Sequence, residues 1–204
     1  MRIEVALVGA LAVVTALLWS PSAAAGVEQG DWLLRVGAHS VNPKSDNHSV
    51  VEVESATMAT FNFTYFFRDA WAVEVLAALP FEHDIELVGG GRVASTKHLP
   101  PTVSVQYHFN TTQRVKPYVG VGLNVTEFFQ EDTTGALAGL DLELDRSFGL
   151  AAQVGVDIDL NENWFVNVDA RYFDIDTDAD LNGTSIGTVE IDPWAVGLSV
   201  GMKF

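Results

Sequence analysis

The sequence predicts an all-β protein, an eight-stranded antiparallel transmembrane β-barrel. The first observation is the C-terminal segment, where apolar residues occupy every second position from Trp194 until the sequence stops at Phe204. The second is that the same alternation recurs in seven upstream segments that are long enough to cross a bilayer as strands. The third is that short and long connections alternate between these segments, which is typical of short periplasmic turns and long extracellular loops.

Residues 1–25 have the features of a secretory signal peptide. Arg2 is followed by an apolar stretch over residues 5–19 and then by small residues up to Ala25. We expect cleavage near Ala25, which leaves residues 26–204 as a single outer-membrane β-barrel domain. No later run of about 18 apolar residues occurs, so the membrane has to be crossed by strands.

Eight segments carry the alternation, and each is expected to form one strand of the barrel. One face of the second segment carries four aromatic residues, Phe61, Phe63, Tyr65 and Phe67. A soluble barrel of the lipocalin type would be polar on that outer face, so the sequence favours a barrel in lipid. In chain order, the expected strands span residues 32–41, 58–67, 71–81, 101–109, 116–129, 148–160, 164–173 and 194–204.

The connections predict which end of the barrel faces the periplasm. Short turns are expected at residues 68–70, 110–114 and 161–163, and long extracellular loops near residues 42–57, 82–99, 130–147 and 174–191. Aromatic residues gather near the turn side, as in an interfacial girdle: Trp71, Tyr107, Phe109, Trp164 and Phe204.

The composition argues against several classes of function. Without the predicted signal peptide the chain keeps 10 basic and 26 acidic residues, and this net charge of −16 disfavours nucleic acid as a partner. The absence of cysteine excludes disulfides, thiolate metal sites and a cysteine nucleophile. No GxSxG nucleophile elbow occurs. We therefore expect no enzymatic activity, no cofactor and no metal site.

Several motifs resemble those of one known family. They are LAALPFEH at residues 76–83, KHLPPT at 97–102, KPYVGVGLN at 116–124, FDIDT at 173–177 and DPW at 192–194. On these motifs the chain resembles the OmpW family of outer-membrane proteins, which includes AlkL-like relatives, over nearly the whole mature sequence. The resemblance implies a porin-like barrel in a Gram-negative outer membrane with a narrow, largely hydrophobic channel. It also implies inward passage of small hydrophobic molecules, because AlkL-type relatives assist the uptake of alkanes.

The prolines predict an opening in the barrel wall. An eight-stranded barrel is just wide enough for side chains or one small ligand, so a water-filled pore is not expected. Prolines, which donate no ladder hydrogen bond, close the third expected strand and open the fourth. A gap there would let a hydrophobic solute leave sideways into the membrane; the alternative is that the prolines only turn the chain. The predicted lateral opening comprises Pro80, Phe81, His98, Leu99, Pro100 and Pro101.

Two further groups of residues are candidates for the channel itself. Charged residues at inward positions are expected to pair into an interior polar network that plugs the lower barrel, or alternatively to line a conducting polar path. These residues are Arg35, Glu74, His108, Asp157, Asp169, Arg171 and Lys203. Leu137, Leu140 and Leu142 are expected at the channel mouth, where they either receive a hydrophobic solute or pack against the barrel rim.

These features predict an outer-membrane channel for passive uptake of small hydrophobic molecules. Solutes would enter at the extracellular loops and leave through the lateral opening. The alternative is a surface structural or interaction protein, a receptor for phage, bacteriocin or host molecules, with no transport role. The expected partners are outer-membrane lipid and lipopolysaccharide, hydrophobic solutes, and the barrel-assembly machinery, which would engage the C-terminal strand ending in Phe204.

Overall fold

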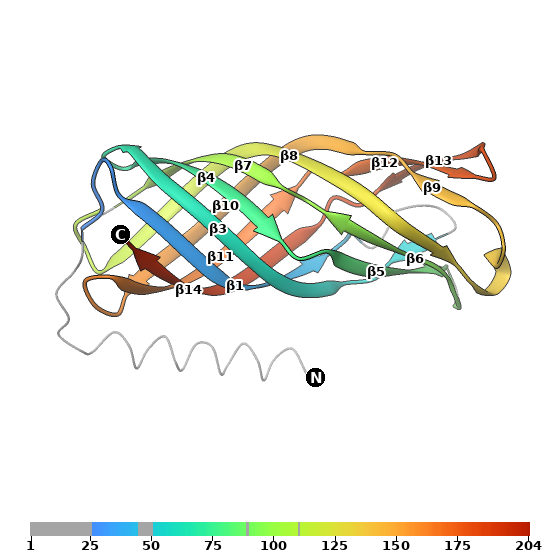
Figure 1. Ribbon diagram of the computed structural model, residues 1–204, viewed down its shortest axis with the longest axis horizontal. Helices are drawn as coiled ribbons and strands as arrows, with labels where there is room; N and C mark the ends of the chain where they lie inside the picture. Colours follow the sequence, from blue (N-terminus) through green and yellow to red (C-terminus); the bar gives the residue numbers. More distant parts are fainter. Residues whose placement is uncertain (1–25, 45–50, 89, 110) are drawn as a thin grey trace.

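The structure is a computed structural model that describes residues 26–44, 51–88, 90–109 and 111–204, so the predicted signal peptide lies outside the described residues. Eight antiparallel strands close into a barrel, as predicted, because the last strand pairs with the first (Figure 1). Within the described part of the chain, no helix is long and apolar enough to span a membrane. In order around the barrel, the strands are β1 (Trp32–Asn42), β3 (Ala56–Arg68), β4 (Trp71–Ala78), β7 (Thr102–His108), β8 (Val115–Thr133), β10 (Ser147–Asp159), β11 (Trp164–Phe173) and β14 (Trp194–Lys203).

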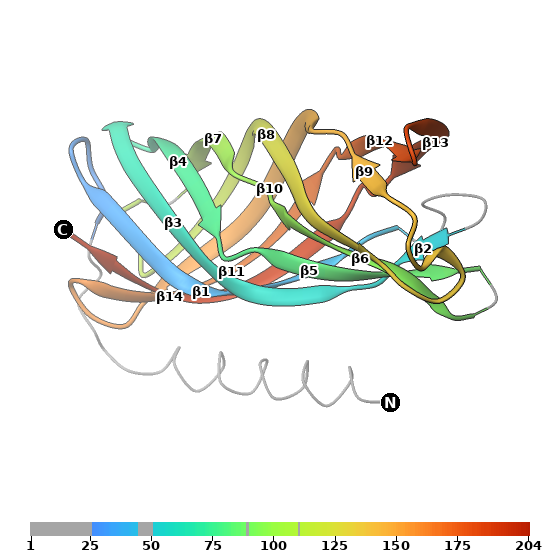
Figure 2. The same ribbon diagram turned by 45° about the vertical axis from the view of Figure 1, so that its right-hand side comes forward.

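The two ends of the barrel differ in how the strands are connected. At one end, here called the turn end, tight turns join β3 to β4 and β10 to β11, and the C-terminus lies beside them (Figure 1). At the other end the long connections form further short strands, here called the outer extension (Figure 2). The outer extension consists of β2 (Val51–Val53), β5 (Phe81–Leu87), β6 (Arg92–Leu99), β9 (Leu142–Leu144), β12 (Asp176–Leu181), β13 (Thr184–Glu190) and the 3-10 helix η1 (Gly135–Leu137).

The long connections were expected to be loops, yet much of their length is strand. β8 continues to Thr133, beyond the part that pairs with β7, and its outer half pairs with β6. β12 and β13 form a hairpin whose turn residues, Asn182 and Gly183, both have positive φ angles of 51° and 72°, as a two-residue turn requires. The wall of the barrel therefore extends outward beyond the eight predicted strands.

Strand alternation places apolar side chains on the outside of the barrel. In β14, Trp194, Val196, Leu198 and Val200 are exposed, whereas the residues between them are buried. Such a surface is stable only against lipid, because contiguous apolar patches of this size are rare on soluble proteins. The outer faces of β5 and β6 instead carry ion pairs, Asp84 with Arg92 at 3.0 Å and Glu82 with Lys97 at 3.8 Å, so the outer extension projects into water.

The interior is divided into apolar and polar layers. A small apolar cluster of Val27, Leu33, Phe66, Ala72 and Phe165 fills the turn end. A larger apolar cluster lies toward the outer extension and includes Leu76, Phe81, Phe128, Phe173 and Ile191. Charged side chains that point inward from the strands lie between these clusters. This layering determines where a hydrophobic solute could lie inside the barrel.

One predicted strand boundary is wrong. The third strand was expected to span residues 71–81, but β4 ends at Ala78 and a new strand, β5, begins at Phe81. The interruption falls at Pro80, which has no N–H to donate to a ladder.

Candidate functional site

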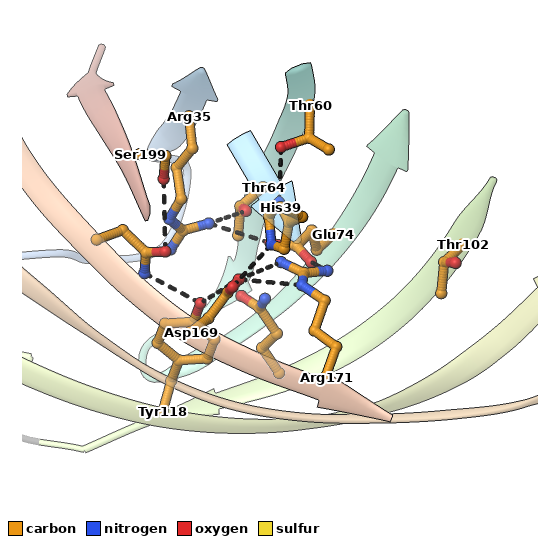
Figure 3. Close-up of polar contacts among 12 residues, drawn as sticks. Arg35, His39, Thr60, Thr64, Glu74, Thr102, Tyr118, Asp169, Arg171 and Ser199 are labelled. Atoms are coloured by element: carbon orange, nitrogen blue, oxygen red, sulfur yellow. Dashed lines mark hydrogen bonds and ion pairs between the residues drawn. The ribbon is translucent and has the colours of Figure 1, made fainter. Parts of the chain in front are cut away.

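A network of charged side chains crosses the interior of the barrel (Figure 3). Arg35 on β1 donates to both oxygens of Asp157 on β10, at 3.1 and 2.8 Å, and to Glu74 on β4 at 3.2 Å. Arg171 on β11 donates to Glu74 at 2.8 Å and to Asp169 at 3.0 and 2.7 Å. Glu74 therefore links two arginines that come from different strands.

Further side chains complete this network. His39, near the middle of the network in Figure 3, lies 2.7 Å from the hydroxyl of Thr60 and 2.7 Å from a carboxylate oxygen of Asp169. Asn167 donates to Asp157 at 2.8 Å and to the hydroxyl of Tyr118 at 3.0 Å. The Arg35 guanidinium also lies over the Tyr118 ring, 5.2 Å from its centre. We call these charged residues and His39 the polar plug: Arg35, His39, Glu74, Asp157, Asp169 and Arg171.

The structure brings together most of the predicted interior residues, with two differences. His108 lies at the edge of the plug, because its Nδ1 is 4.0 Å from Asp157 while its ring stacks on Tyr118. Lys203 lies outside the plug, at the turn end, where it is partly exposed and donates to the backbone oxygen of Gly26 at 2.8 Å. Lys203 is the last residue of β14, so a side chain on the inner face of the strand at this position lies at the mouth of the barrel rather than in the lumen.

Every charge in the polar plug is buried and paired. Arg35 is 0% exposed, Glu74 1% and Arg171 2%, so water does not screen them. Buried charges persist only where ion pairs and hydrogen bonds compensate their lost hydration, and here each has at least one such partner within 3.2 Å. This geometry supports a plug rather than a conducting polar path.

The N-terminal segment closes the turn end below the plug. Val27 is buried against Phe66 and Phe165, and its N–H donates to the backbone oxygen of Thr111 at 2.9 Å. Gly30 N–H donates to the backbone oxygen of Phe66 at 2.8 Å. A solute moving straight through the barrel would have to displace both the polar plug and this segment.

Four residues of the predicted lateral opening, Pro80, Leu99, Pro100 and Pro101, lie at a break in the hydrogen-bond ladder, whereas Phe81 and His98 pair with each other at its outer edge. β4 and β7 remain paired up to Leu76 and Thr102, and β5 and β6 are paired from Phe81 and His98 onward. Between these pairs no ladder joins the two sides, and we call this interval the wall break. Its residues are Ala77 to Pro80 on one side and Leu99 to Pro101 on the other.

Side chains fill the wall break from inside. Phe81 is 2% exposed and Pro100 is buried, and both line a cavity of about 10 Å³ that also touches His39 of the polar plug. Pro80 and Leu99 are half-buried, and Pro101 is exposed. Packing of these side chains thus joins the two sides of the break, in place of a ladder of backbone hydrogen bonds.

Asn124 on β8 holds the proline side of the wall break. Its side-chain amide donates to the backbone oxygen of Pro100 at 3.2 Å and to the hydroxyl of Thr102 at 2.9 Å. Thr126 in turn donates to the Asn124 side-chain oxygen at 2.7 Å. These contacts satisfy a backbone acceptor that a regular ladder would otherwise have paired.

Three stacked rings lead from the wall break into the outer extension. Phe81 stacks on His98 with ring centres 5.4 Å apart, and His98 stacks on His83 at 4.9 Å. We call Phe81, His98 and His83 the aromatic stack. Burial lowers the pKa of His83, and burial together with His83 lowers the pKa of His98 to about 3, so both imidazoles are neutral at physiological pH.

The two histidines of the stack line an apolar cavity of about 30 Å³, here called the outer cavity. The other residues that line it are Val53, Ile85, Thr96, Phe128, Leu144, Thr177, Val189 and Ile191. Phe81 links the two cavities, because it lines the cavity beside the wall break and its ring stacks on His98 and His83, which line the outer cavity.

The three leucines predicted at the channel mouth occupy different environments. Leu142 is 6% exposed and belongs to an apolar cluster with Ile85, Val93 and Ala94 in the outer extension, and Leu137 packs against that cluster. Leu140 is half-buried. Leu142 and Leu137 thus pack in the same apolar cluster of the outer extension.

Sequence reasoning missed several residues that shape this site. His83 was expected in a loop, although Phe81, His83 and Ile85 alternate with acidic residues in a strand-like pattern that could have revealed its inward direction. Asn124 and His39 were expected on the inner face of the barrel, but their hydrogen-bond partners were not predicted. Val27 carried no signal, because its role depends on where the N-terminal segment crosses the barrel.

Comparison with known proteins agrees with this architecture. The model of the OmpW family matches residues 28–204. Outer membrane protein W of Vibrio cholerae is 42% identical, with 95% of this chain and 97% of that protein aligned. Outer membrane protein AlkL of Ectopseudomonas oleovorans is 31% identical, over 90% of this chain and 86% of that protein.

A solved structure supports the same conclusion. The crystal structure of the outer membrane protein OprG from Pseudomonas aeruginosa superposes with a TM-score of 0.77 at 35% identity, covering 88% of this chain and 98% of that chain. These relatives are outer-membrane proteins, as the lipid-facing surface of the barrel requires. The chain therefore belongs to the OmpW family and is a β-barrel of the bacterial outer membrane.

Proposed function

We propose that the protein is a passive channel that takes small hydrophobic molecules from the outer extension to the wall break and releases them sideways into the membrane. The observation that carries this proposal is the position of Phe81. Phe81 lines the cavity beside the wall break, and its ring stacks on the two histidines that line the apolar outer cavity. It lies next to the interval where neither the β4–β7 ladder nor the β5–β6 ladder joins the two sides.

The polar plug favours a sideways route over a straight one. An apolar molecule gains nothing from contact with buried ion pairs, and to pass them it would have to separate Arg35 and Arg171 from Glu74. Moving Phe81 breaks only packing contacts and leads directly to lipid, where the molecule is soluble. The predicted lateral opening, Pro80 to Phe81 and His98 to Pro101, is therefore retained as the exit.

At the outer end, the solute would enter through the apolar cluster that includes Leu142. Leu137 packs against this cluster, and Leu144 both packs against it and lines the outer cavity. Apolar side chains that part and close again can admit a hydrophobic solute while they exclude water and ions. The leucines thus serve as a gate at the channel mouth in this proposal.

The C-terminal residue suits recognition by the barrel-assembly machinery. The backbone of Phe204 exchanges two hydrogen bonds of 3.0 Å with Trp32, yet Phe204 is 60% exposed, so its ring is accessible at the turn end. Phe204→Ala should lower the amount of folded barrel in the outer membrane without changing transport per folded molecule. Equal amounts of the variant and the parent would argue against this role.

The channel is tested by the uptake of a labelled alkane into cells with and without the protein, with a soluble sugar as the control solute. We expect faster uptake of the alkane alone. The double variant Pro100→Val/Pro101→Val restores two backbone donors at the wall break and should slow this uptake while the barrel still folds. Pro117→Val on β8 is the matched control, since Pro117 lies in the paired part of the wall, and it should leave uptake unchanged.

Two outcomes would oppose the proposal. Unchanged alkane uptake by the folded double variant would rule out the wall break as the exit. Equal alkane uptake by cells with and without the folded barrel would reject the channel altogether and favour the surface interaction role. In that case, exchange of the outer extension should abolish the interaction.

A further inference from the structure

The outer cavity contains a buried polar atom that a purely hydrophobic channel does not need. Nδ1 of His83 contacts the backbone oxygen of Glu54. Because a carbonyl oxygen can only accept, Nδ1 carries the proton and Nε2 is the atom with the free lone pair. His83 is 2% exposed, and Nε2 has no hydrogen-bond partner among the described residues. Buried acceptors without a donor are rare in folded proteins, so this atom requires an explanation.

The hydroxyl groups that line the same cavity are already engaged. Thr177 donates to the backbone oxygen of Asp145 at 2.7 Å, and Thr96 lies 3.4 Å from the backbone oxygen of Lys97. The remaining lining, apart from the ring of His98, is aliphatic or aromatic. A solute in this cavity therefore meets a largely apolar wall with a buried acceptor that lacks a donor, Nε2 of His83, which a hydrogen-bond donor on the solute could satisfy.

The electrostatics of the cavity select the kind of donor. Both imidazoles are neutral, because burial lowers the pKa of His83 and lowers that of His98 to about 3. An ammonium group would lose its hydration in this apolar space without gaining an anionic partner, which disfavours amines. A neutral hydroxyl supplies one donor at a much smaller desolvation cost.

We propose that His83 is a specificity-determining residue and that the channel prefers small hydrophobic molecules with one hydroxyl group, alcohols or phenols, whose O–H donates to Nε2 of His83. This inference rests on the proposed function and names its substrate class. It distinguishes such molecules from alkanes of the same size, which leave Nε2 unpaired.

The dimensions of the site fit this chemistry. A cavity of about 30 Å³ accommodates roughly two water-sized groups, which is the size of a terminal CH₂–OH group. The aromatic stack runs from this point to the wall break, with adjacent ring centres 4.9 and 5.4 Å apart. The apolar remainder of the molecule can lie against these rings as it moves toward Phe81.

The contact is tested directly by nitrogen NMR of the purified full-length barrel in lipid nanodiscs, with the histidines labelled with ¹⁵N. 1-Octanol is titrated against octane, which has no donor, and against methyl heptyl ether, which has only an acceptor. We expect the His83 Nε2 resonance to shift with 1-octanol alone. His83→Phe, which keeps a ring in the stack, identifies the resonance by its loss, and heat-dependent gel mobility checks that the variant is folded.

The consequence for transport is measured as uptake of labelled 1-octanol and octane into cells, each corrected for cells without the protein. One added hydrogen bond predicts a preference for 1-octanol of about fivefold in the parent. His83→Phe should abolish this preference while octane uptake persists. His98→Phe is the matched control, because it changes a ring in the same cavity but leaves Nε2 of His83, and it should keep the preference.

The outcomes separate the two proposals. If 1-octanol does not shift the His83 Nε2 resonance, solvent alone satisfies this atom and the inference is overturned. Equal uptake of 1-octanol and octane by cells with the parent protein would overturn it as well. Either result leaves the channel intact as long as both compounds enter faster than in cells without the protein. Failure of both compounds to enter faster would instead reject the channel itself.

Discussion

Replacement of Glu74 by glutamine tests whether the polar plug is held by its charge pairs. Glu74 is 1% exposed and accepts hydrogen bonds from Arg35 at 3.2 Å and from Arg171 at 2.8 Å. Glutamine keeps the size of the side chain but loses its charge, and it can turn its oxygen toward only one guanidinium. Its amide N–H groups then face the donors of the other arginine.

The expected cost follows from the burial of the network. Removing one partner of a buried ion pair costs about 3–5 kcal/mol, because a charge is left without compensation. Here each arginine keeps a second carboxylate, Asp157 for Arg35 and Asp169 for Arg171, so the lower end of this range applies. Glu74→Gln should therefore lower the free energy of unfolding by about 3 kcal/mol, which is about a hundredfold in the folding equilibrium.

The assay is urea unfolding of the barrel in lipid vesicles, followed by tryptophan fluorescence and by gel mobility with and without heating. Glu162→Gln is the matched control, since Glu162 lies exposed in the turn between β10 and β11 and should change stability by less than about 0.5 kcal/mol. A loss below about 1 kcal/mol for Glu74→Gln, with an unchanged denaturant slope, would refute the argument that paired charges hold the plug together.

Three further predictions concern other parts of the barrel. Gly37→Ala should destabilise the barrel by about 2 kcal/mol in the same urea assay, because the new Cβ would lie 2.2 Å from the backbone oxygen of Leu198, whereas the outward change Ala38→Val should have little effect. Asn124→Ala removes one of the two side-chain donors to the Pro100 carbonyl, the other being the Thr102 hydroxyl, and should speed alkane uptake by loosening the wall break; slower or unchanged uptake would argue against that role. In the folded barrel His98 has a pKa of about 3, below the ordinary value of 6.5 that applies to the unfolded chain. As the pH falls, the unfolded chain therefore binds a proton at this histidine before the folded barrel does. The stability that neutral His98 contributes is therefore complete above pH 6.5 and is lost as the pH falls toward 3, by about 2–3 kcal/mol at pH 4.5. The free energy of unfolding should thus be lower at pH 4.5 than at pH 7.5, and His98→Phe should remove this part of the difference.

Much of the barrel could be predicted because strand alternation is a local property. Whether Val196 or Gly197 faces lipid follows from the residues on either side of it, and the structure confirms that Val196 is exposed and Gly197 is buried. The interruption at Pro80 is equally local, because a missing N–H weakens any ladder. The prediction was less successful in the long connections, where strands such as β5 and β6 depend on the edge that the outer half of β8 offers.

The sequence by itself determined that the chain is a membrane barrel, which residues face its lumen, and where its wall is weakened by proline. Only the tertiary structure decided which of the lumenal groups meet. Arg35 pairs with Asp157, 122 positions away, and His83 lies beside His98 and the backbone of Glu54. The reason is that inward direction is set within one strand, whereas contacts across the lumen depend on the stagger of all eight strands when the barrel closes.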